Sequence, residues 1–320
     1  MALISDNLHS QKRDLVRLAR GVLLGLVTFA VVDLAVDSIL HRGLERYFGL
    51  DSEKAVLLVG HSHVVLGVDK ERLETSLALP VAKYARAGAG LEDRIVAVNQ
   101  YLSRHEEPPA AVVFGVDGHL FAPRGLSSNS YTLFYPFMEE PLVGEHIRAK
   151  ARTRAEFVAR NFIRLCRYDD VLLNGARRGL SGNWSNSISG AFDPERLARR
   201  VELGDVRRLE IDAAQLEIFR AFLERMASLE VPVILAFIPT TDAWNRIDED
   251  RFKAVLAKLD GFDQSFANVS FVDLLPAFSH RHDLFADPIH LNPKGQQLVT
   301  EALSRRLAAL LELSVGESEQ

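Results

Sequence analysis

The sequence predicts an α/β fold: a three-layer α/β/α sandwich around a parallel sheet of about five strands, preceded by one membrane-spanning helix. Two observations predict the sandwich. From residue 54 onward, short apolar segments of strand length alternate with segments of helical periodicity, and the connections between them are short. A third observation predicts the membrane helix, because residues 21–32 form an unbroken uncharged run.

Length and composition are those of an ordinary globular protein. The 320 residues suffice for one large α/β domain or two small ones, and 48% are hydrophobic and 25% charged. The formal net charge is −5, and the basic residues are scattered, with no pair denser than Arg177-Arg178. This charge pattern argues against nucleic acid as a partner. The single cysteine, Cys166, excludes an intrachain disulfide.

The N-terminal apolar run has the features of a signal anchor. It reaches the ~20 residues of a membrane span only by including Asp33 and Asp37, which lie towards its C-terminal end, where the interface is close. Four basic residues precede the run: Lys12, Arg13, Arg17 and Arg20. They predict a single-pass protein of the cytoplasmic (inner) membrane whose following domain is extracytoplasmic. Residues 1–50 are expected to form the cytoplasmic tail and the anchor helix.

Two other interpretations of this run stay open. A cleaved signal peptide fits the charged start and the apolar core, although no small-x-small cleavage site follows. An amphipathic or buried helix of a soluble protein is the other. If the run crosses the membrane, Asp33 and Asp37 are expected to face a partner helix rather than lipid, which predicts a membrane complex.

The alternating segments define the predicted domain, residues 51–320. Strands are expected at residues 55–60, 81–88, 110–117, 231–239 and 269–274. Helices are expected at residues 69–79, 91–105, 147–175, 207–229, 247–260 and 293–312. The last helix follows Asn292-Pro293, a favourable pair of N-cap and first-turn residues. Residues 120–205 interrupt the alternation and are predicted to form an insertion near the mouth of the sheet.

The chemistry is expected at the carboxyl ends of the strands, where open parallel sheets carry their sites. Ser62 follows the first strand in the stretch VLLVGHSH, and Asp287 and His290 follow the fifth strand in FADPIHLNPKG. A nucleophilic serine needs a base, and the base needs an orienting acid. These residues are therefore predicted to be nucleophile, orienting carboxylate and general base. The backbone N–H groups of Ser62 and Gly90 are expected to stabilise an oxyanion.

Other roles for these residues stay open. Ser62 is also a suitable helix N-cap. His61 and His63 could bind zinc with Asp287 and His290, but Ser62 would then have no role. We therefore expect both histidines to line the cleft, and we predict neither a metal nor a cofactor.

Further candidates for contact with a substrate lie after the third strand and in the insertion. His119 follows the third strand and is a candidate for the cleft. Four side chains of the insertion could contact a sugar, or could instead pack the insertion onto the domain: Tyr131, Tyr135, Trp184 and Asn186.

These motifs resemble the SGNH (GDSL-like) hydrolase superfamily over residues 54–119 and 231–312. Asp287-Pro288-Ile289-His290 fits the family's Asp-x-x-His block in full, and Gly90 corresponds to its oxyanion glycine. Gly60-His61-Ser62 stands where the family has Gly-Asp-Ser, and Gly115-Val116-Asp117-Gly118 stands where it has Gly-x-Asn-Asp. The resemblance implies a flavodoxin-like fold and a Ser-His-Asp hydrolase site.

Asp117 departs from the family pattern at a position with a chemical role. The resemblance implies an oxyanion-hole asparagine there, and an ionised carboxylate would repel an oxyanion. Asp117 is therefore protonated, or it turns away, or another donor such as His119 takes its place. This departure favours the alternative of a non-catalytic scaffold that binds polysaccharide or a membrane partner.

The anchor, the altered first block and the long insertion together resemble one branch of the superfamily. That branch contains the D-alanyl transfer protein of teichoic acid synthesis and the alginate O-acetylation proteins. The resemblance implies an acyltransferase or esterase that modifies an envelope or exported polysaccharide through an acyl-serine intermediate. It also implies a membrane-bound O-acyltransferase as a partner.

Overall fold

A single sheet of five parallel strands lies at the centre of the domain, and it confirms the predicted α/β class. The computed structural model describes residues 2–123 and 125–318, and Met1, Arg124, Glu319 and Gln320 lie outside it. The side chains of residues 2–12, 14 and 312–318 also lie outside the description, and they include Lys12 of the predicted basic flank. The strands are β1 (Val56–Gly60), β2 (Val81–Ala85), β3 (Ala111–Val116), β4 (Val233–Phe237) and β5 (Val269–Asp273).

The strand order is β2-β1-β3-β4-β5, and every neighbouring pair is parallel. The chain therefore adds β2 on one side of β1 and all later strands on the other side. Parallel sheets bind their ligands where this reversal leaves a crevice, at the carboxyl ends of the two strands that flank it. Here those strands are β1 and β3, and Ser62 and Asp117 follow them directly.

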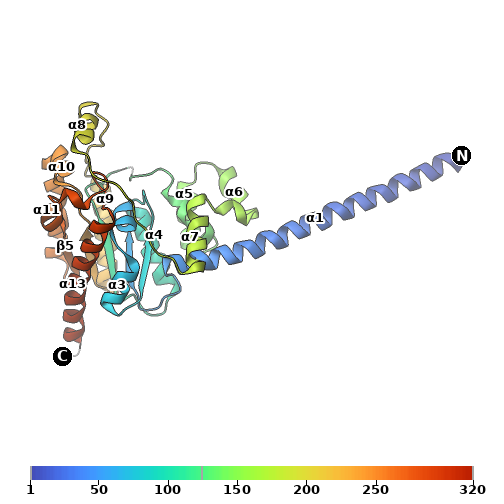
Figure 1. The fold of residues 1–320 in the computed structure, drawn as a ribbon. Helices are drawn as coiled ribbons and strands as arrows, with labels where there is room; N and C mark the ends of the chain where they lie inside the picture. The colour runs from blue at the N-terminus through green and yellow to red at the C-terminus, as the bar shows by residue number, and fades with distance from the viewer. Residues whose placement is uncertain (1, 124, 319–320) are drawn as a thin grey trace.

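Both faces of the sheet are buried, because successive side chains of a strand point to opposite faces. Leu57 and Val59 belong to one apolar core with α4 (Leu91–Arg104), α9 (Ala213–Ser228) and α11 (Glu249–Ser265). Val56 and Leu58 belong to a second core with α3 (Lys70–Leu77) and α13 (Pro293–Ser318). Figure 1 shows α3 and α13 close together at one side of the sheet. The predicted cap of α13 is present, since Asn292 Oδ1 accepts the N–H of Gly295 at 3.0 Å.

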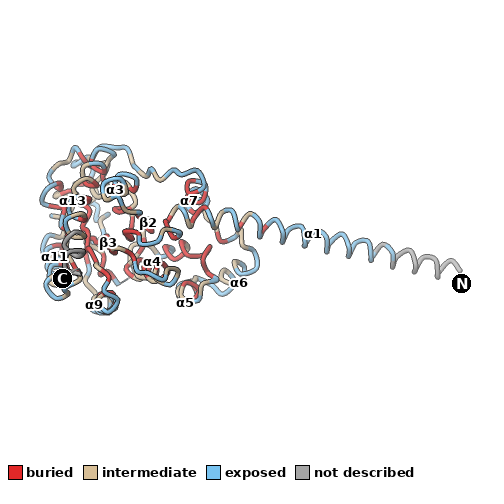
Figure 2. Tube along the Cα trace, turned by 90° about the horizontal axis from the view of Figure 1, so that it is seen from below, coloured by how far each residue is buried: buried red, intermediate tan, exposed pale blue. Residues whose placement is uncertain are grey.

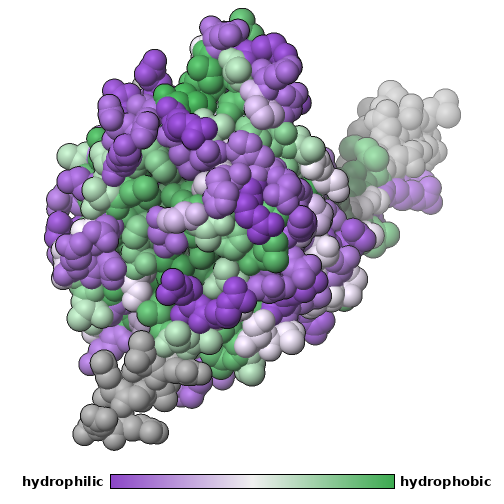
Figure 3. Space-filling model, turned by 60° about the vertical axis from the view of Figure 1, so that its left-hand side comes forward, coloured by the Kyte–Doolittle hydropathy of each residue, from purple (hydrophilic) through white to green (hydrophobic). Residues whose placement is uncertain are grey.

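The remaining helices are the long N-terminal α1, which precedes the sheet, and a set of short helices in the connections. They are α1 (Ala2–Phe48), α2 (Ser62–Gly67), α5 (Pro141–Lys150), α6 (Arg154–Phe162), α7 (Asp170–Ser181), α8 (Pro194–Glu202), α10 (Asp242–Asn245) and α12 (Leu275–Phe278), with 3₁₀ turns η1 (Ser130–Phe137), η2 (Arg164–Arg167), η3 (Arg246–Asp248) and η4 (His282–Leu284). On the face opposite the exit of α1, hydrophilic side chains alternate with small apolar patches, as on an ordinary soluble domain (Figure 3).

The segment predicted to be helical at residues 147–175 is helical over most of its length, but it is divided into several short elements. The segment contains the end of α5, all of α6, η2 and the start of α7. The breaks coincide with N-caps: Thr153 Oγ1 accepts the N–H of Glu156, and Asp169 Oδ1 accepts the N–H of Leu172. Asp193 begins the unpredicted α8 in the same way, by accepting the N–H of Arg196.

Helix α1 projects far from the domain, with its apolar side chains exposed along most of its length (Figures 1 and 2). Residues 15–48 are long and apolar enough to cross a membrane, by length and composition. The C-terminal end of α1 packs against α7 at very short range. A Cβ on Gly43 would overlap the backbone of Ala176, and one on Gly179 would overlap the backbone of Gly43.

Asp33 and Asp37 are both buried, at 4% exposure, although most of α1 around them is exposed. The expectation that they face a partner helix is corrected: their partners belong to the same chain. Asp33 accepts the backbone N–H groups of Arg164 and Leu165. The insertion therefore satisfies the carboxylates within one molecule, and they give no reason to expect a membrane complex.

Candidate active site

Ser62 is the first residue of the short helix α2, directly above the carboxyl end of β1. Two glycines allow α2 to sit this close to the sheet, because a Cβ on either Gly60 or Gly115 would overlap the side chain of Val64. Ser62 is not the N-cap. His61 occupies that position, and its Nδ1 lies 3.4 Å from the N–H of His63. The Ser62 hydroxyl is therefore available for contacts across the sheet edge.

The structure brings Ser62, His290 and Asp287 together in one hydrogen-bonded chain. His290 Nε2 lies 2.9 Å from Ser62 Oγ, and His290 Nδ1 lies 2.8 Å from Asp287 Oδ2. Both distances are within the reach required for proton transfer and for orientation of the base. Because 228 positions of sequence separate Ser62 from His290, only the parallel sheet brings the two residues together.

Asp287 uses its two oxygens for different purposes. Oδ1 accepts the backbone N–H groups of Ile289 and His290, both at 2.9 Å, and Oδ2 faces the imidazole. Burial alone would raise the pKa of Asp287, but the hydrogen bonds from the His290 ring and from the two N–H groups hold the pKa below its ordinary value. An ionised Asp287 fixes the proton on His290 Nδ1, so that Nε2 presents a lone pair to Ser62.

A second histidine and aspartate lie behind Ser62. His61 Nδ1 is 3.2 Å from Ser62 Oγ, and His61 Nε2 is 2.9 Å from Asp117 Oδ2, a charge contact without good hydrogen-bond geometry. Arg94, with only 1% of its side chain exposed, donates to the same oxygen of Asp117 at 2.9 Å. Asp117 Oδ1 accepts the N–H of His119 at 2.8 Å.

These contacts correct the expectation for Asp117 in the oxyanion hole. Burial would raise its pKa, but the neighbouring His61 imidazole and Arg94 guanidinium hold the pKa well below its ordinary range, so Asp117 is ionised. Both of its oxygens are engaged by protein donors. Asp117 therefore acts as the buried counter-ion of Arg94 and is no donor to an oxyanion.

Gly90 also differs from its expected role. Its N–H donates to Asp93 Oδ2 at 2.9 Å and is therefore not free to bind an oxyanion. Gly88, two residues earlier, lines the cavity at Ser62 and has a φ of 81°, a conformation that favours glycine. Within the described part of the chain, no acceptor binds the N–H of Gly88 or of Ser62. These two N–H groups are therefore free to donate to a ligand in the cavity.

His63 and His119 line the same cavity, as expected for cleft residues. The His63 ring centroid lies 4.1 Å from that of His61 and 5.7 Å from that of His290. In the described part of the structure, the Nδ1 atoms of His63 and His119 are buried without a hydrogen-bond partner. Burial lowers the pKa of both rings, so they are neutral at pH 7. No group of three or more histidine, cysteine or acidic residues in the described chain has the geometry of a metal site.

The cavity beside Ser62 has a volume of about 300 Å³ and contains residues that the sequence analysis missed. Thr240 and Trp244 follow β4, Arg200 comes from the insertion, and Arg207 lies in the segment between α8 and α9. Trp244 and Arg200 also line an adjacent cavity of about 340 Å³, which Asp287 borders. The rule that sites follow parallel strands would have found Thr240 and Trp244, had it been applied to the fourth strand as well.

The four sugar-contact candidates of the insertion lie elsewhere. Tyr131 and Tyr135 are buried in the apolar core, at 3% and 0% exposure. The Trp184 indole lies over the Lys70 ammonium, and Asn186 bonds to Arg178. None of the four lines the cavity at Ser62. They pack the insertion onto the domain, which was the other interpretation of these residues.

The chain matches no protein-family model and no curated protein sequence. The likeness to the SGNH superfamily is therefore one of motifs, carried by Gly60-His61-Ser62 and Asp287-Pro288-Ile289-His290. The distances from Ser62 to His290 and from His290 to Asp287 are properties of this structure and hold whether or not the chain belongs to that superfamily.

Proposed function

We propose that the protein is a membrane-anchored, serine-dependent acyltransferase or esterase. The observation that carries the proposal is the hydrogen-bonded chain from Ser62 Oγ through His290 to Asp287, at 2.9 and 2.8 Å. With it we propose the flavodoxin-like, three-layer fold of the SGNH superfamily, which the strand order supports. The apolar α1 supports a single-pass anchor in the inner membrane with the domain outside the cytoplasm.

In the first half-reaction Ser62 Oγ attacks the carbonyl carbon of an acyl donor. The hydroxyl proton passes to His290 Nε2, and the N–H groups of Ser62 and Gly88 stabilise the negative charge on the carbonyl oxygen. When the tetrahedral intermediate collapses, His290 returns the proton to the leaving oxygen. The product is an acyl ester on Ser62 and a released alcohol.

In the second half-reaction the same groups act in reverse. His290 Nε2 takes the proton of an incoming hydroxyl, whose oxygen attacks the acyl-Ser62 carbonyl, and then gives this proton to Ser62 Oγ as the ester bond breaks. A sugar hydroxyl as acceptor gives acyl transfer, and water gives hydrolysis. Trp244 and the guanidinium groups of Arg200 and Arg207 line the cavity and suit a sugar ring with polar substituents.

The substrate and the partner rest on the motif resemblance. We propose an envelope or exported polysaccharide as the acyl acceptor, and a membrane-bound O-acyltransferase as the protein that supplies the acyl group. The non-catalytic scaffold was favoured by a carboxylate expected in the oxyanion hole. Pairing of Asp117 with Arg94 gives this carboxylate a structural role, which supports the catalytic proposal over the scaffold.

The test is covalent labelling of the detergent-solubilised full chain with a fluorophosphonate, which reacts with activated serines. We expect labelling of wild-type protein, and loss of labelling and of ester hydrolysis by about three orders of magnitude or more in Ser62→Ala, without a change in melting temperature. Ser265→Ala is the matched control, because Ser265 is an exposed serine whose hydroxyl bonds only to the carbonyl of Gly261. Wild-type protein that resists the reagent, or a labelled Ser62→Ala variant, would refute the proposal.

A further inference from the structure

Helix α6 presents its apolar face outward. Ala155, Val158, Ala159 and Phe162 recur at helical spacing, and all four are exposed; Phe162 is 81% exposed and Val158 49%. The charged residues between them point the other way. Arg160 and Glu156 form a 2.8 Å ion pair, and the Arg160 guanidinium lies over the ring of the buried Tyr135. This orientation is the reverse of that of a surface helix in a soluble protein.

The turn that follows α6 is fixed to α1 within its apolar run. Arg164 and Leu165 of η2 donate their backbone N–H groups to Asp33 at 2.9 and 3.0 Å. Asp37 accepts from the Arg164 guanidinium at 3.1 Å and from the Tyr168 hydroxyl at 2.7 Å. Two carboxylates in an apolar span are costly unless they are paired, so these contacts hold η2 against this part of α1.

The depth of this contact follows from helix geometry. At a rise of 1.5 Å per residue, the twenty residues 21–40 span about 30 Å, the thickness of a bilayer's hydrocarbon core. Asp33 then lies about 10 Å inside the far edge of the core. Because η2 donates hydrogen bonds to Asp33, η2 lies at the same depth as Asp33. Helix α6 ends directly before η2.

Exposed apolar residues lie on both sides of the contact between η2 and α1. Val32 and Leu34, which flank Asp33, are 50% and 49% exposed, and Ile163 between α6 and η2 is 37% exposed. In Figures 1 and 2, α6 is the part of the domain that reaches furthest along α1.

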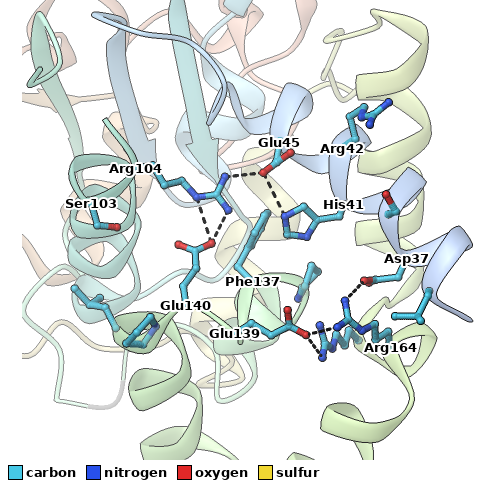
Figure 4. Close-up of a pocket in the computed structure, with 16 residues that line it drawn as sticks. Asp37, His41, Arg42, Glu45, Ser103, Arg104, Phe137, Glu139, Glu140 and Arg164 are labelled. Carbon is cyan, nitrogen blue, oxygen red and sulfur yellow. Dashed lines mark hydrogen bonds and ion pairs between the residues drawn. The ribbon is translucent and has the colours of Figure 1, made fainter. Parts of the chain in front are cut away.

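The opposite, inward side of this junction is polar and internally paired. Figure 4 shows Arg164 between Asp37 and Glu139, and Arg104 between Glu45 and Glu140. The charged groups at this junction are therefore paired with one another within the chain.

We propose that α6 and η2, residues 154–167, are embedded in the outer leaflet of the membrane beside α1. The occupant of the apolar face is lipid, because this face adjoins the lipid-exposed side of α1 at hydrocarbon depth. The exposed cations Arg152 and Arg154, before and at the start of α6, favour anionic headgroups. The inference requires α1 to span the bilayer and does not depend on the chemistry at Ser62.

The test is a depth measurement on the full-length protein in vesicles of phosphatidylcholine and phosphatidylglycerol. Cys166 is the only cysteine of the chain, so Cys166→Ser gives a background for single probes. An environment-sensitive fluorophore is attached in turn to Phe162→Cys, to Leu24→Cys in α1, and to Leu203→Cys at the end of α8. Leu203 is the matched control, because it is 82% exposed and directly follows α8, which lies far from α1 (Figure 1).

We expect lipids with a quencher in their acyl chains to quench the probes at positions 162 and 24 to a comparable extent, and to leave the probe at 203 unquenched. The emission at 162 should also shift to shorter wavelength when vesicles are added. Quenching at 24 without quenching at 162 would overturn the inference while leaving the anchor intact. Absence of quenching at both positions would overturn the anchor and the inference together. The melting temperature of each variant, compared with that of Cys166→Ser, reports independently on its fold.

Discussion

Replacement of Asp287 by asparagine should suppress the reactivity proposed for Ser62 through the tautomer of His290. Asp287 Oδ1 accepts two backbone N–H groups, and Oδ2 accepts from His290 Nδ1. In the variant the amide oxygen must take the place of Oδ1, because an NH₂ group there would face two donors. The NH₂ group then points at Nδ1 and forces the imidazole proton onto Nε2. Ser62 would then face an N–H group and no longer a base.

The expected loss is about 10⁴-fold in the rate of acylation, which corresponds to about 5 kcal/mol of transition-state stabilisation. The expected loss of folding stability is only about 1 kcal/mol, because the two backbone hydrogen bonds of the loop are retained. Asp287→Ala is the contrasting variant. It removes all three interactions and should both inactivate the protein and loosen the loop that carries His290.

The assay is the second-order rate constant of fluorophosphonate labelling, with the urea midpoint of unfolding measured in the same detergent. An Asp287→Asn variant that labels within about tenfold of the wild-type rate would refute the tautomer argument, since a tenfold change is only about 1.4 kcal/mol. A large loss of stability in Asp287→Asn would mean that the amide does not keep the two backbone hydrogen bonds.

Three further perturbations address the surroundings of Ser62. Asp117→Asn leaves the Arg94 charge buried and unpaired and should lower the free energy of unfolding by about 3–5 kcal/mol. The double variant with Arg94→Met should regain much of this loss. A urea midpoint near that of wild type in Asp117→Asn would contradict the buried ion pair. His63 stays neutral in the fold because burial lowers its pKa, whereas in the unfolded chain it gains a proton below about pH 6.5. Stability should therefore fall as the pH drops from 6.5, and His63→Gln should reduce that slope by about 1.4 kcal/mol per pH unit, as measured by unfolding titrations between pH 5 and 7.5. Gly88→Ala places a Cβ 2.6 Å from that of Ser127 at a positive φ and should slow labelling about 100-fold by moving the N–H. Gly90→Ala should label normally, because φ there is −79° and its nearest neighbour is 3.6 Å away; equal rates for the two glycine variants would exclude Gly88 as the donor.

The three central residues could be predicted from sequence because their signals are local. Ser62 directly follows an apolar strand, and Asp287 and His290 lie three positions apart before a capped helix. Because parallel strands end at the same edge of the sheet, residues that follow two such strands are expected to lie close together, and this predicts the contact between Ser62 and His290.

The errors concern properties that depend on long-range packing. Which glycine offers a free N–H depends on the Asp93 side chain that binds Gly90. The state of Asp117 depends on Arg94, whose approach no spacing rule predicts. Residues 147–175 showed helical periodicity, but periodicity identifies only an apolar face of a helix and does not predict whether that face packs against the domain or is exposed. Phe162 therefore could not be recognised as exposed.

The close contact of Gly43 with α7 joins the membrane helix to the domain without a hinge. A flexible tether would let a domain explore a volume that grows with the length of the tether. Here α1 continues unbroken to Phe48, and β1 begins at Val56. Ser62 is accordingly held at a fixed position relative to α1. If α1 is the proposed anchor, the cleft moves only as α1 tilts, rotates or diffuses, and an acyl donor in the same membrane would reach it by a two-dimensional search in the plane of the bilayer.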